Sequence, residues 1–335
     1  MSTPLLAVDN LAVVTAENLP IIEDVTFSLG RGEVLGLVGE SGSGKSMSCR
    51  ALMRLLPSKS LQIARGAVRF EGTELLALNE PQMRAIRGRR MGMIFQNPAS
   101  HLDPVMSIGQ QIAETLRVHR NAGRRAAWRE AIEMLRQVGI PDPERRARDY
   151  AHQFSGGMRQ RAMIALVLAC GPDLIIADEP TTALDVTVQA QIIRLLLDLR
   201  DQRGVSIILI THDLGLVAQT CDTVAVMYAG RICERGAKRD ILATPLHPYT
   251  RDLIACQPAT SRVGSLLPSI PGQPPLPTAY PAGCRFNPRC AKATDICREI
   301  SPMLDAYRDT QVAACHHAEK RALNKLPEDA RTATA

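Results

Sequence analysis

Apolar residues gather in three uninterrupted runs that predict buried strands of a parallel sheet. The runs are 34–38 (Val-Leu-Gly-Leu-Val), 174–177 and 205–210. A strand that is buried on both faces needs an apolar side chain at almost every position, whereas a half-buried strand alternates apolar and polar ones. Polar residues follow each run, and parallel α/β sheets bind their ligands beyond the carboxyl ends of their strands. The pattern therefore predicts an α/β fold with a ligand site at that end of the sheet.

The spacing of apolar residues becomes helical between about residues 98 and 160. Segments 109–119 and 124–138 repeat apolar side chains at helical intervals, and Gly139 punctuates the end of the second. We expect an inserted α-helical subdomain here, within a unit of alternating strands and helices that covers residues 1–235.

The chain becomes rich in proline after this unit. Residues 236–323 are expected to form an extended, mostly irregular C-terminal extension, which carries four of the nine cysteines. The polar tail that follows, residues 324–335, is expected to be disordered.

Composition narrows the class of protein. Aromatic residues make up 3% of the 335 residues, too few for a surface that stacks on bases, so we expect no nucleic-acid partner. The formal charge of +6 comes largely from arginine runs, which we interpret as solvated faces rather than as a lipid or nucleic-acid surface. No apolar run approaches the length of a membrane span, and the N-terminus lacks a signal-peptide pattern. We expect a cytosolic chain.

Residues 39–46, Gly-Glu-Ser-Gly-Ser-Gly-Lys-Ser, fit the phosphate-loop pattern G-x-x-x-x-G-K-[ST]. A predicted strand leads into them, and a helix is predicted from Met47 to Leu56, before Pro57. Glycines let successive backbone N–H groups face one centre, and the N-terminus of the helix adds its positive end. Lys45 is expected to reach the terminal phosphates and Ser46 to bind Mg²⁺. The nucleotide-binding residues of the loop are Gly39, Glu40, Ser41, Gly42, Ser43, Gly44, Lys45 and Ser46.

Four polar residues that follow predicted strands complete a hydrolytic site beside this loop. Asp178 is the expected carboxylate for Mg²⁺, and the adjacent Glu179 is well placed to orient and deprotonate an attacking water. His212 ends the next strand, where an imidazole can sense bound nucleotide. Gln96 offers a neutral amide that can touch both metal and water. The catalytic candidates are thus Glu179, His212 and Gln96, and the Mg²⁺ ligands are Ser46, Gln96 and Asp178.

A second anion-binding helix start, Ser155-Gly156-Gly157 followed by Gln160, lies well after the first. With these motifs in this order, residues 5–235 resemble the ATP-binding subunits of ABC transporters. The resemblance implies a RecA-like P-loop ATPase core that uses ATP and Mg²⁺. It also implies that the Ser155 motif acts on the ATP of a second, homologous or identical ATPase subunit, and that Asp185 belongs to the D-loop.

The resemblance narrows to the oligopeptide/dipeptide importers. It rests on residues 180–191 (Pro-Thr-Thr-Ala-Leu-Asp-Val-Thr-Val-Gln-Ala-Gln), 247–250, 271–275 and 283–286. It implies an ATPase, peripheral on the cytoplasmic face of the bacterial inner membrane, that powers peptide import. The implied partners are two transmembrane permease subunits and a periplasmic or extracellular substrate-binding protein.

Other interpretations of the chain stay open at this point. Members of the same branch transport nickel chelates, opines, glutathione or oligosaccharides. A soluble ABC ATPase that acts on nucleic acid or ribosomes is disfavoured, because the chain has one ATPase module and no heptad array. A small-molecule P-loop kinase would not need the Ser155-Gly156-Gly157 motif.

One stretch departs from the pattern of the ABC family. These subunits usually carry an aromatic residue near the first strand that stacks on adenine, and residues 11–16 (Leu-Ala-Val-Val-Thr-Ala) contain none. Stacking on a base contributes about 1–3 kcal/mol in nucleic-acid binders, so ATP binding is expected to be about tenfold weaker or more.

Four cysteines of the extension, Cys284, Cys290, Cys297 and Cys315, are separated by five, six and seventeen residues. This spacing matches neither the bacterial ferredoxin run nor paired zinc-ribbon motifs, and it leaves a metal site and free thiols equally open. The family resemblance favours a metal centre, an iron–sulfur cluster of the [4Fe-4S] type, with Zn²⁺ as the alternative. The other five cysteines are expected to be small buried hydrophobes.

Overall fold

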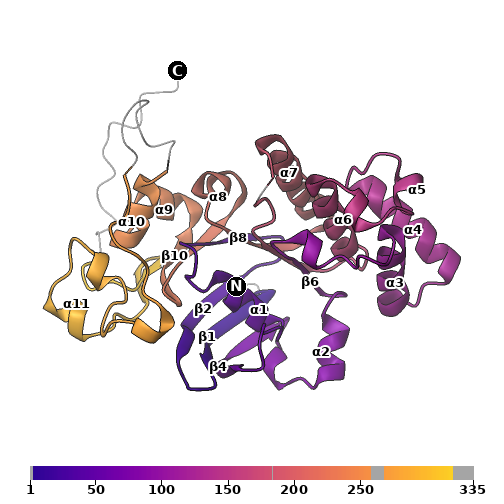
Figure 1. The fold of residues 1–335 in the computed structure, drawn as a ribbon. Helices are drawn as coiled ribbons and strands as arrows, with labels where there is room; N and C mark the ends of the chain where they lie inside the picture. The colour runs from indigo at the N-terminus through magenta and orange to yellow at the C-terminus, as the bar shows by residue number, and fades with distance from the viewer. Residues whose placement is uncertain (1–2, 183, 258–267, 320–335) are drawn as a thin grey trace.

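The computed structural model describes residues 3–182, 184–257 and 268–319 (Figure 1). The predicted disordered tail, 324–335, and residues 320–323 of the extension lie outside these ranges. Within them, eight strands form one mixed sheet in the order β11-β12-β10-β9-β3-β8-β7-β6. The bounds are β3 Val34–Val38, β6 Met91–Ile94, β7 Leu174–Asp178, β8 Ser206–Thr211, β9 Thr223–Tyr228, β10 Arg231–Ala237, β11 Asp305–Arg308 and β12 Gln311–Ala313.

The apolar runs of the sequence form the centre of this sheet, as predicted. β3 pairs in parallel with β8 and β9, and β7 pairs in parallel with β8 and β6. Every residue of β3, β7 and β8 is buried, which explains why these strands show no alternation of polar and apolar residues. Their carboxyl ends lead into the phosphate loop, Glu179 and His212.

A second sheet, which the sequence analysis missed, lies near the N-terminus. Its antiparallel strands β1 Leu6–Thr15, β2 Pro20–Leu29, β4 Leu61–Phe70 and β5 Thr73–Glu74 are arranged as β2-β1-β4-β5. Register shifts interrupt the pairing of β1 with both neighbours, so its apolar residues do not alternate cleanly. This sheet packs with α1 (Lys45–Leu52) around a shared core that includes Leu11, Phe27 and Leu52.

The helix after the phosphate loop is shorter than predicted. It ends at Leu52 instead of Leu56, and Arg54 adopts a left-handed φ of 53°. A left-handed residue cannot continue an α-helix, so the chain turns before it reaches Pro57. A 3-10 turn, η1 (Leu75–Ala77), and a short helix, α2 (Glu80–Ile86), follow β5.

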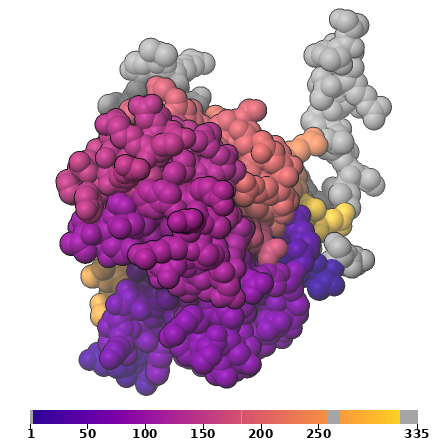
Figure 2. All heavy atoms as spheres, turned by 90° about the vertical axis from the view of Figure 1, so that its right-hand side faces the viewer, coloured from indigo at the N-terminus to yellow at the C-terminus, as the bar shows by residue number. Residues whose placement is uncertain are grey.

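Helices replace strands between β6 and β7, as the sequence predicted. Segments 109–119 and 124–138 correspond to α3 (Ile108–Arg120) and α4 (Arg124–Gln137). The other elements of this region are η2 Pro98–Ser100, α5 Pro143–Arg146, η3 Ala151–Gln153 and α6 Gly156–Leu168. The region forms the right-hand part of Figure 1 and faces the viewer in Figure 2. Two helices follow it: α7 Val186–Arg203 and α8 Leu214–Thr220.

The C-terminal extension is more regular than expected. It contains α9 Lys238–Ala243, α10 Pro248–Ala255, η5 Pro277–Ala279, η6 Asn287–Arg289 and α11 Asp295–Glu299, besides β11 and β12. β12 adds to the main sheet by antiparallel pairing with β10. The fully buried carboxylate of Glu234 in β10 accepts hydrogen bonds from Gln311 Nε2 at 2.7 Å and from the backbone N–H groups of Leu246 and His247. The extension is therefore part of the same folded body.

Candidate nucleotide-binding site

The phosphate loop connects β3 to α1 and adopts a conformation that only glycine permits at two places. Gly44 precedes the helix with φ of 102°, in the left-handed region. At Gly39, φ is 151°, and an added Cβ would lie 2.2 Å from the carbonyl oxygen of Met227. These glycines let the loop curl tightly against β9, as an anion-binding loop requires.

The amine of Lys45 lies inside the curled loop. Its Nζ donates hydrogen bonds of 2.8 Å to the carbonyl oxygens of Gly39 and Glu40, and the residue is 5% exposed. Burial lowers the pKa of this amine, although the nearby carboxylates of Glu179 and Asp178 oppose that shift. A buried ammonium held by neutral carbonyls can exchange them for phosphate oxygens, to which it binds more strongly.

Ser46, in a helix, and Asp178, in a strand, are brought together from distant parts of the chain. The hydroxyl of Ser46, at the start of α1, donates a 2.7 Å hydrogen bond to Oδ1 of Asp178, at the end of β7. Burial raises the pKa of Asp178, and the hydrogen bond from Ser46 partly offsets that rise. A hydroxyl and a buried carboxylate at this distance form the two-oxygen arrangement that Mg²⁺ prefers.

The carboxylate of Glu179 is the point where three side chains converge. Gln96 Nε2 donates a hydrogen bond of 2.9 Å to Glu179 Oε2, and Thr182 Oγ1 donates to the same oxygen at 2.8 Å. His212 Nδ1 lies 3.6 Å from Oε1. The structure therefore groups Glu179, Gln96 and His212 as predicted. Thr182 also contacts Glu179. The sequence did not indicate this role, although Thr182 lies only three residues after Glu179.

The backbone of Glu179 is held in an uncommon conformation. Its φ is 45°, and its N–H donates a 3.0 Å hydrogen bond to the carbonyl of Ile210 in β8. A left-handed non-glycine residue is retained only where its surroundings fix it, and such residues concentrate at functional sites. This turn aims the carboxylate away from the strand and toward the Gln96 side of the sheet.

The Ser155 motif caps its own helix. Ser155 Oγ accepts from the backbone N–H of Met158 at 3.3 Å, at the N-terminus of α6. A Cβ on Gly157 would come within 2.9 Å of Val188 in α7, so the two helices approach closely there. Asp185 caps α7 by accepting from the backbone N–H of Val188 at 2.9 Å.

The Ser155 motif and the phosphate loop are not joined within the chain. Across residues 3–182, 184–257 and 268–319, no hydrogen bond links residues 155–157 to residues 39–46. Gln160 is 2% exposed, and its Nε2 finds no acceptor among these residues.

Two residues of the extension contact the phosphate loop, which the sequence analysis did not foresee. The phenolic oxygen of Tyr249 accepts a 2.9 Å hydrogen bond from the backbone N–H of Glu40. Both terminal nitrogens of Arg289 donate to the carboxylate of Glu40, at 2.7 and 3.0 Å. The phosphate loop is therefore held in part by residues beyond 235. No motif marks these two positions, because the contact depends on how the extension packs.

The four C-terminal cysteines lie in one region of the extension. Burial, with a smaller contribution from the nearby Cys315, Cys297 and Cys290, raises the pKa of Cys284 to about 11. Sγ of Cys297 is 3.4 Å from Nε2 of His317. Among the described residues, however, no three His, Cys, Asp or Glu side chains are arranged to hold a metal ion. The geometry does not support the iron–sulfur or zinc hypothesis.

The other cysteines behave as expected. Cys49, Cys170, Cys221 and Cys233 are buried, and Cys256 is partly buried. None of the described helices is both long and apolar enough to cross a bilayer.

Comparison with known proteins identifies the class to which this fold and site belong. Residues 22–182 match the family model of the ABC transporter, and residues 233–297 match that of the oligopeptide/dipeptide transporter C-terminal region. The fold resembles that of cbiO1 from Clostridium perfringens, part of the ABC transporter complex cbiONQ, with a TM-score of 0.62 and 26% identity over 72% of this chain and 92% of that one.

Similarity to curated proteins extends over most of the chain. It is 52% identical to a probable peptide ABC transporter ATP-binding protein of Sinorhizobium fredii, over 87% of each chain. It is 45% identical to the dipeptide transport ATP-binding protein DppD of Bacillus subtilis, over 90% of each. The chain belongs to the ATP-binding subunits of ABC transporters, in the oligopeptide/dipeptide transporter family. It is an ABC ATPase that powers transport.

Proposed function

We propose that this ATPase powers the import of peptides across the bacterial inner membrane. The hydrolytic part of the proposal rests on the convergence of Gln96, Thr182 and His212 on Glu179, beside the pair Ser46–Asp178. Relatives whose names assign them to peptide and dipeptide transport support peptides as the cargo. Nickel chelates, opines, glutathione and oligosaccharides are the alternative cargoes to be compared with peptides.

Each residue of the site has a distinct task in hydrolysis. Lys45 leaves the carbonyls of Gly39 and Glu40 to bind the β- and γ-phosphates of ATP. Ser46, Asp178 and Gln96 would hold Mg²⁺, which when bound neutralises charge that develops on the phosphates. The loop N–H groups and the N-terminus of α1 orient the phosphate chain.

Glu179 is proposed as the general base. Its carboxylate accepts hydrogen bonds from Gln96 and Thr182 on Oε2, which leaves Oε1 free to accept a proton from a water in line with the γ-phosphate. His212 lies on the Oε1 side with a side chain that is 66% exposed, so it can turn toward the γ-phosphate and report its presence.

The site is proposed to be completed by a second ATPase subunit, homologous or identical. Ser155, Gly156, Gly157 and Gln160 present the N-terminus of α6, and no hydrogen bond in the described part of the chain ties residues 155–157 to its own phosphate loop. A helix N-terminus that is not used within the chain can bind the γ-phosphate on the partner. Asp185, which caps α7, would lie beside it in the interface between the two subunits.

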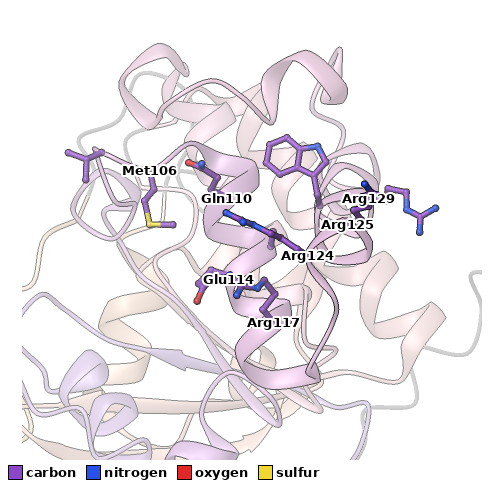
Figure 3. Close-up of a pocket in the computed structure, with 10 residues that line it drawn as sticks. Met106, Gln110, Glu114, Arg117, Arg124, Arg125 and Arg129 are labelled. Carbon is purple, nitrogen blue, oxygen red and sulfur yellow. Dashed lines mark hydrogen bonds and ion pairs between the residues drawn. The ribbon is translucent and has the colours of Figure 1, made fainter.

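The helical region carries a groove that fits a cytoplasmic segment of a permease subunit. The groove, of about 1010 Å³, lies between α3 and α4 and is shown in Figure 3. Its wall combines the apolar Val105, 80% exposed, and Trp128 with Arg124, Arg125 and Arg129. An exposed apolar surface flanked by cations favours an amphipathic helix with acidic residues at its edge.

We propose that the chain is a peripheral subunit on the cytoplasmic face of the membrane, with two transmembrane permeases and a substrate-binding protein outside.

A photo-crosslinker at Val105 should link the chain to a permease, whereas one at the exposed Ser58 should not. Equal labelling from both positions would contradict the docking surface.

The cysteines carry the finer part of the proposal, a metal centre formed by Cys284, Cys290, Cys297 and Cys315. The four cysteines influence one another electrostatically, which supports their proximity. The family resemblance favours an iron–sulfur cluster over zinc, since four thiolates suit either. Their side chains would have to reorient, because no three ligand-type residues of the described chain converge as they stand. Elemental analysis after anaerobic purification tests this: about four irons, or one zinc, per chain supports a centre, and neither metal refutes it.

The experiment that tests the function as a whole is co-purification from membranes, followed by ATPase assays with a binding protein present. Peptides should stimulate hydrolysis, and the alternative cargoes should not. If peptides do not stimulate hydrolysis but nickel chelates, opines, glutathione or oligosaccharides do, the assigned cargo changes and the ATPase assignment stands. Stimulation by nucleic acid without membrane partners would overturn the transport assignment.

A further inference from the structure

Glu40, the second residue of the phosphate loop, is held through all three of its polar groups. Its carbonyl accepts from Lys45 Nζ, its N–H donates to Tyr249 Oη, and its carboxylate accepts from both terminal nitrogens of Arg289. Only the first of these bonds comes from the loop itself. The other two come from the C-terminal extension, 209 and 249 residues further along the chain.

Arg289 is oriented by the extension before it meets the loop. Its side chain is 5% exposed, and it donates to the carbonyls of Pro271 and Ile270 at 2.7 and 3.3 Å, besides the phenolic oxygen of Tyr228 at 3.2 Å. A guanidinium that is fixed in this way presents a rigid fork to a carboxylate and loses little side-chain entropy on pairing. The position of Arg289 therefore determines where the Glu40 carboxylate lies, and not the reverse.

Tyr249 provides a second contact that is independent of charge. It is fully buried, with ring centroids 4.6 Å from Tyr228 and 5.3 Å from Phe286. Its hydroxyl satisfies the N–H of Glu40, one of the backbone donors at the start of the loop. Because the ring cannot shift within this cluster, the hydroxyl fixes the direction of that N–H.

We propose that Arg289 and Tyr249 are positioning residues for the phosphate loop, through which the extension sets the affinity of the ATPase for MgATP. They touch neither phosphate nor metal. They hold Glu40, whose carbonyl is one of the two that the Lys45 amine must leave when nucleotide binds. The proposal deepens the nucleotide site and rests on it, and MgATP binding by the unaltered chain tests that site separately.

By reciprocity, a contact that favours nucleotide binding must itself be favoured by bound nucleotide. MgATP should therefore slow hydrogen exchange in residues 284–290 of the extension. If the contact with Glu40 only anchored the extension, MgATP would not slow hydrogen exchange in these residues, because nucleotide would not change the contact.

The test is a double-mutant cycle on the whole chain with MgATP as the probe. Arg289→Gln and Glu40→Gln should each raise the Kd for MgATP about tenfold, as expected for loss of a charge-assisted hydrogen bond. The double variant should be no weaker than either single one, because each change removes the same interaction. Arg298→Gln is the control, since Arg298 pairs with Asp295 on the exposed side of α11.

Three results would overturn the proposal. The first is a Kd for MgATP that does not change in Arg289→Gln. The second is a double variant whose increase in Kd equals the product of the two single increases. The third is that MgATP still slows hydrogen exchange in residues 284–290 of Glu40→Gln. If Arg289→Gln does not fold, Tyr249→Phe decides the matter, because it deletes one oxygen from a filled cluster. Tyr249→Phe should weaken MgATP binding severalfold. Tyr280→Phe should not, because the hydroxyl of Tyr280 donates to Ile21 and not to the loop. Equal affinities in these two variants would also refute the proposal.

Discussion

The amide of Gln96 donates a 2.9 Å hydrogen bond to the carboxylate of Glu179, joining residues 83 positions apart. Gln96 follows β6 at the border of the helical region, and Glu179 follows β7 in the core of the sheet. A displacement of the helical region would thus be felt by the proposed general base. Such a link between the proposed docking groove and the proposed general base is what a transport ATPase needs.

Replacing Glu179 by glutamine should abolish turnover and retain ATP. The amide keeps the shape of the carboxylate but cannot accept a proton, and loss of a general base lowers rates by about 10²–10⁴-fold. Single-turnover hydrolysis and MgATP binding should be measured together, with Glu299→Gln on the exposed end of α11 as the control. Hydrolysis within a factor of two of the unaltered chain would remove Glu179 from the mechanism.

Lys45→Ala should lose nucleotide binding. The substitution removes the buried cation that lies in the loop, and with it a positive charge close to the carboxylates of Asp178 and Glu179. Isothermal titration with MgATP should show no saturable binding, whereas the exposed-residue variant Lys59→Ala should bind normally. Affinity preserved in Lys45→Ala would contradict the assignment of the loop.

Ser155→Arg should act on the partner's site. The variant should bind MgATP almost normally, because Ser155 bonds to its own helix and not to its own phosphate loop. Mixed with unaltered ATPase subunits, it should block hydrolysis at the partner's phosphate loop by filling the space before α6. Measuring activity against the fraction of variant subunits tests this, with Ser58→Arg as the control. If Ser155→Arg loses ATP binding as fully as Lys45→Ala, Ser155 acts within its own chain.

The stability of the protein should fall between pH 7 and pH 5 because of His247. Burial, together with the nearby positive charge of Arg251, lowers the pKa of this imidazole to about 4. In the unfolded chain its pKa is about 6.5, so on acidification the unfolded state takes up the proton first and folding loses about 2 kcal/mol at pH 5.

His247→Asn isolates this contribution, because asparagine can still accept from the N–H of Tyr249 but does not titrate. Urea unfolding at pH 7 and pH 5 should show a smaller pH effect in this variant than in the unaltered chain or in the exposed control His152→Asn. An equal pH effect in all three proteins would assign the acid sensitivity to other groups.

The features that the sequence predicted are those that depend on local pattern. β3, β7 and β8 are buried on both faces, so their apolar runs were unambiguous, and the phosphate loop is defined by residues that stand next to one another. The antiparallel N-terminal sheet was missed, because bulges in β1 break the alternation that marks a half-buried strand.

Other features could not have been predicted because they depend on packing between distant segments. Thr182 binds Glu179 only because the turn after β7 is left-handed at Glu179. Arg289 reaches Glu40 across 249 positions of sequence, and its neighbours in the chain, Pro288 and Cys290, predict no such role.

The pairing of β12 with β10 has a consequence for how this ATPase can be dissected. A chain cut after residue 237 would leave β10 as an edge strand, with Glu234 and Arg235 no longer paired with β12 and the Glu234 carboxylate without its donor Gln311. Unprotected edges of this kind recruit strands from other molecules. We expect the truncated protein to aggregate instead of yielding a minimal ATPase. The extension therefore also protects the β10 edge of the main sheet.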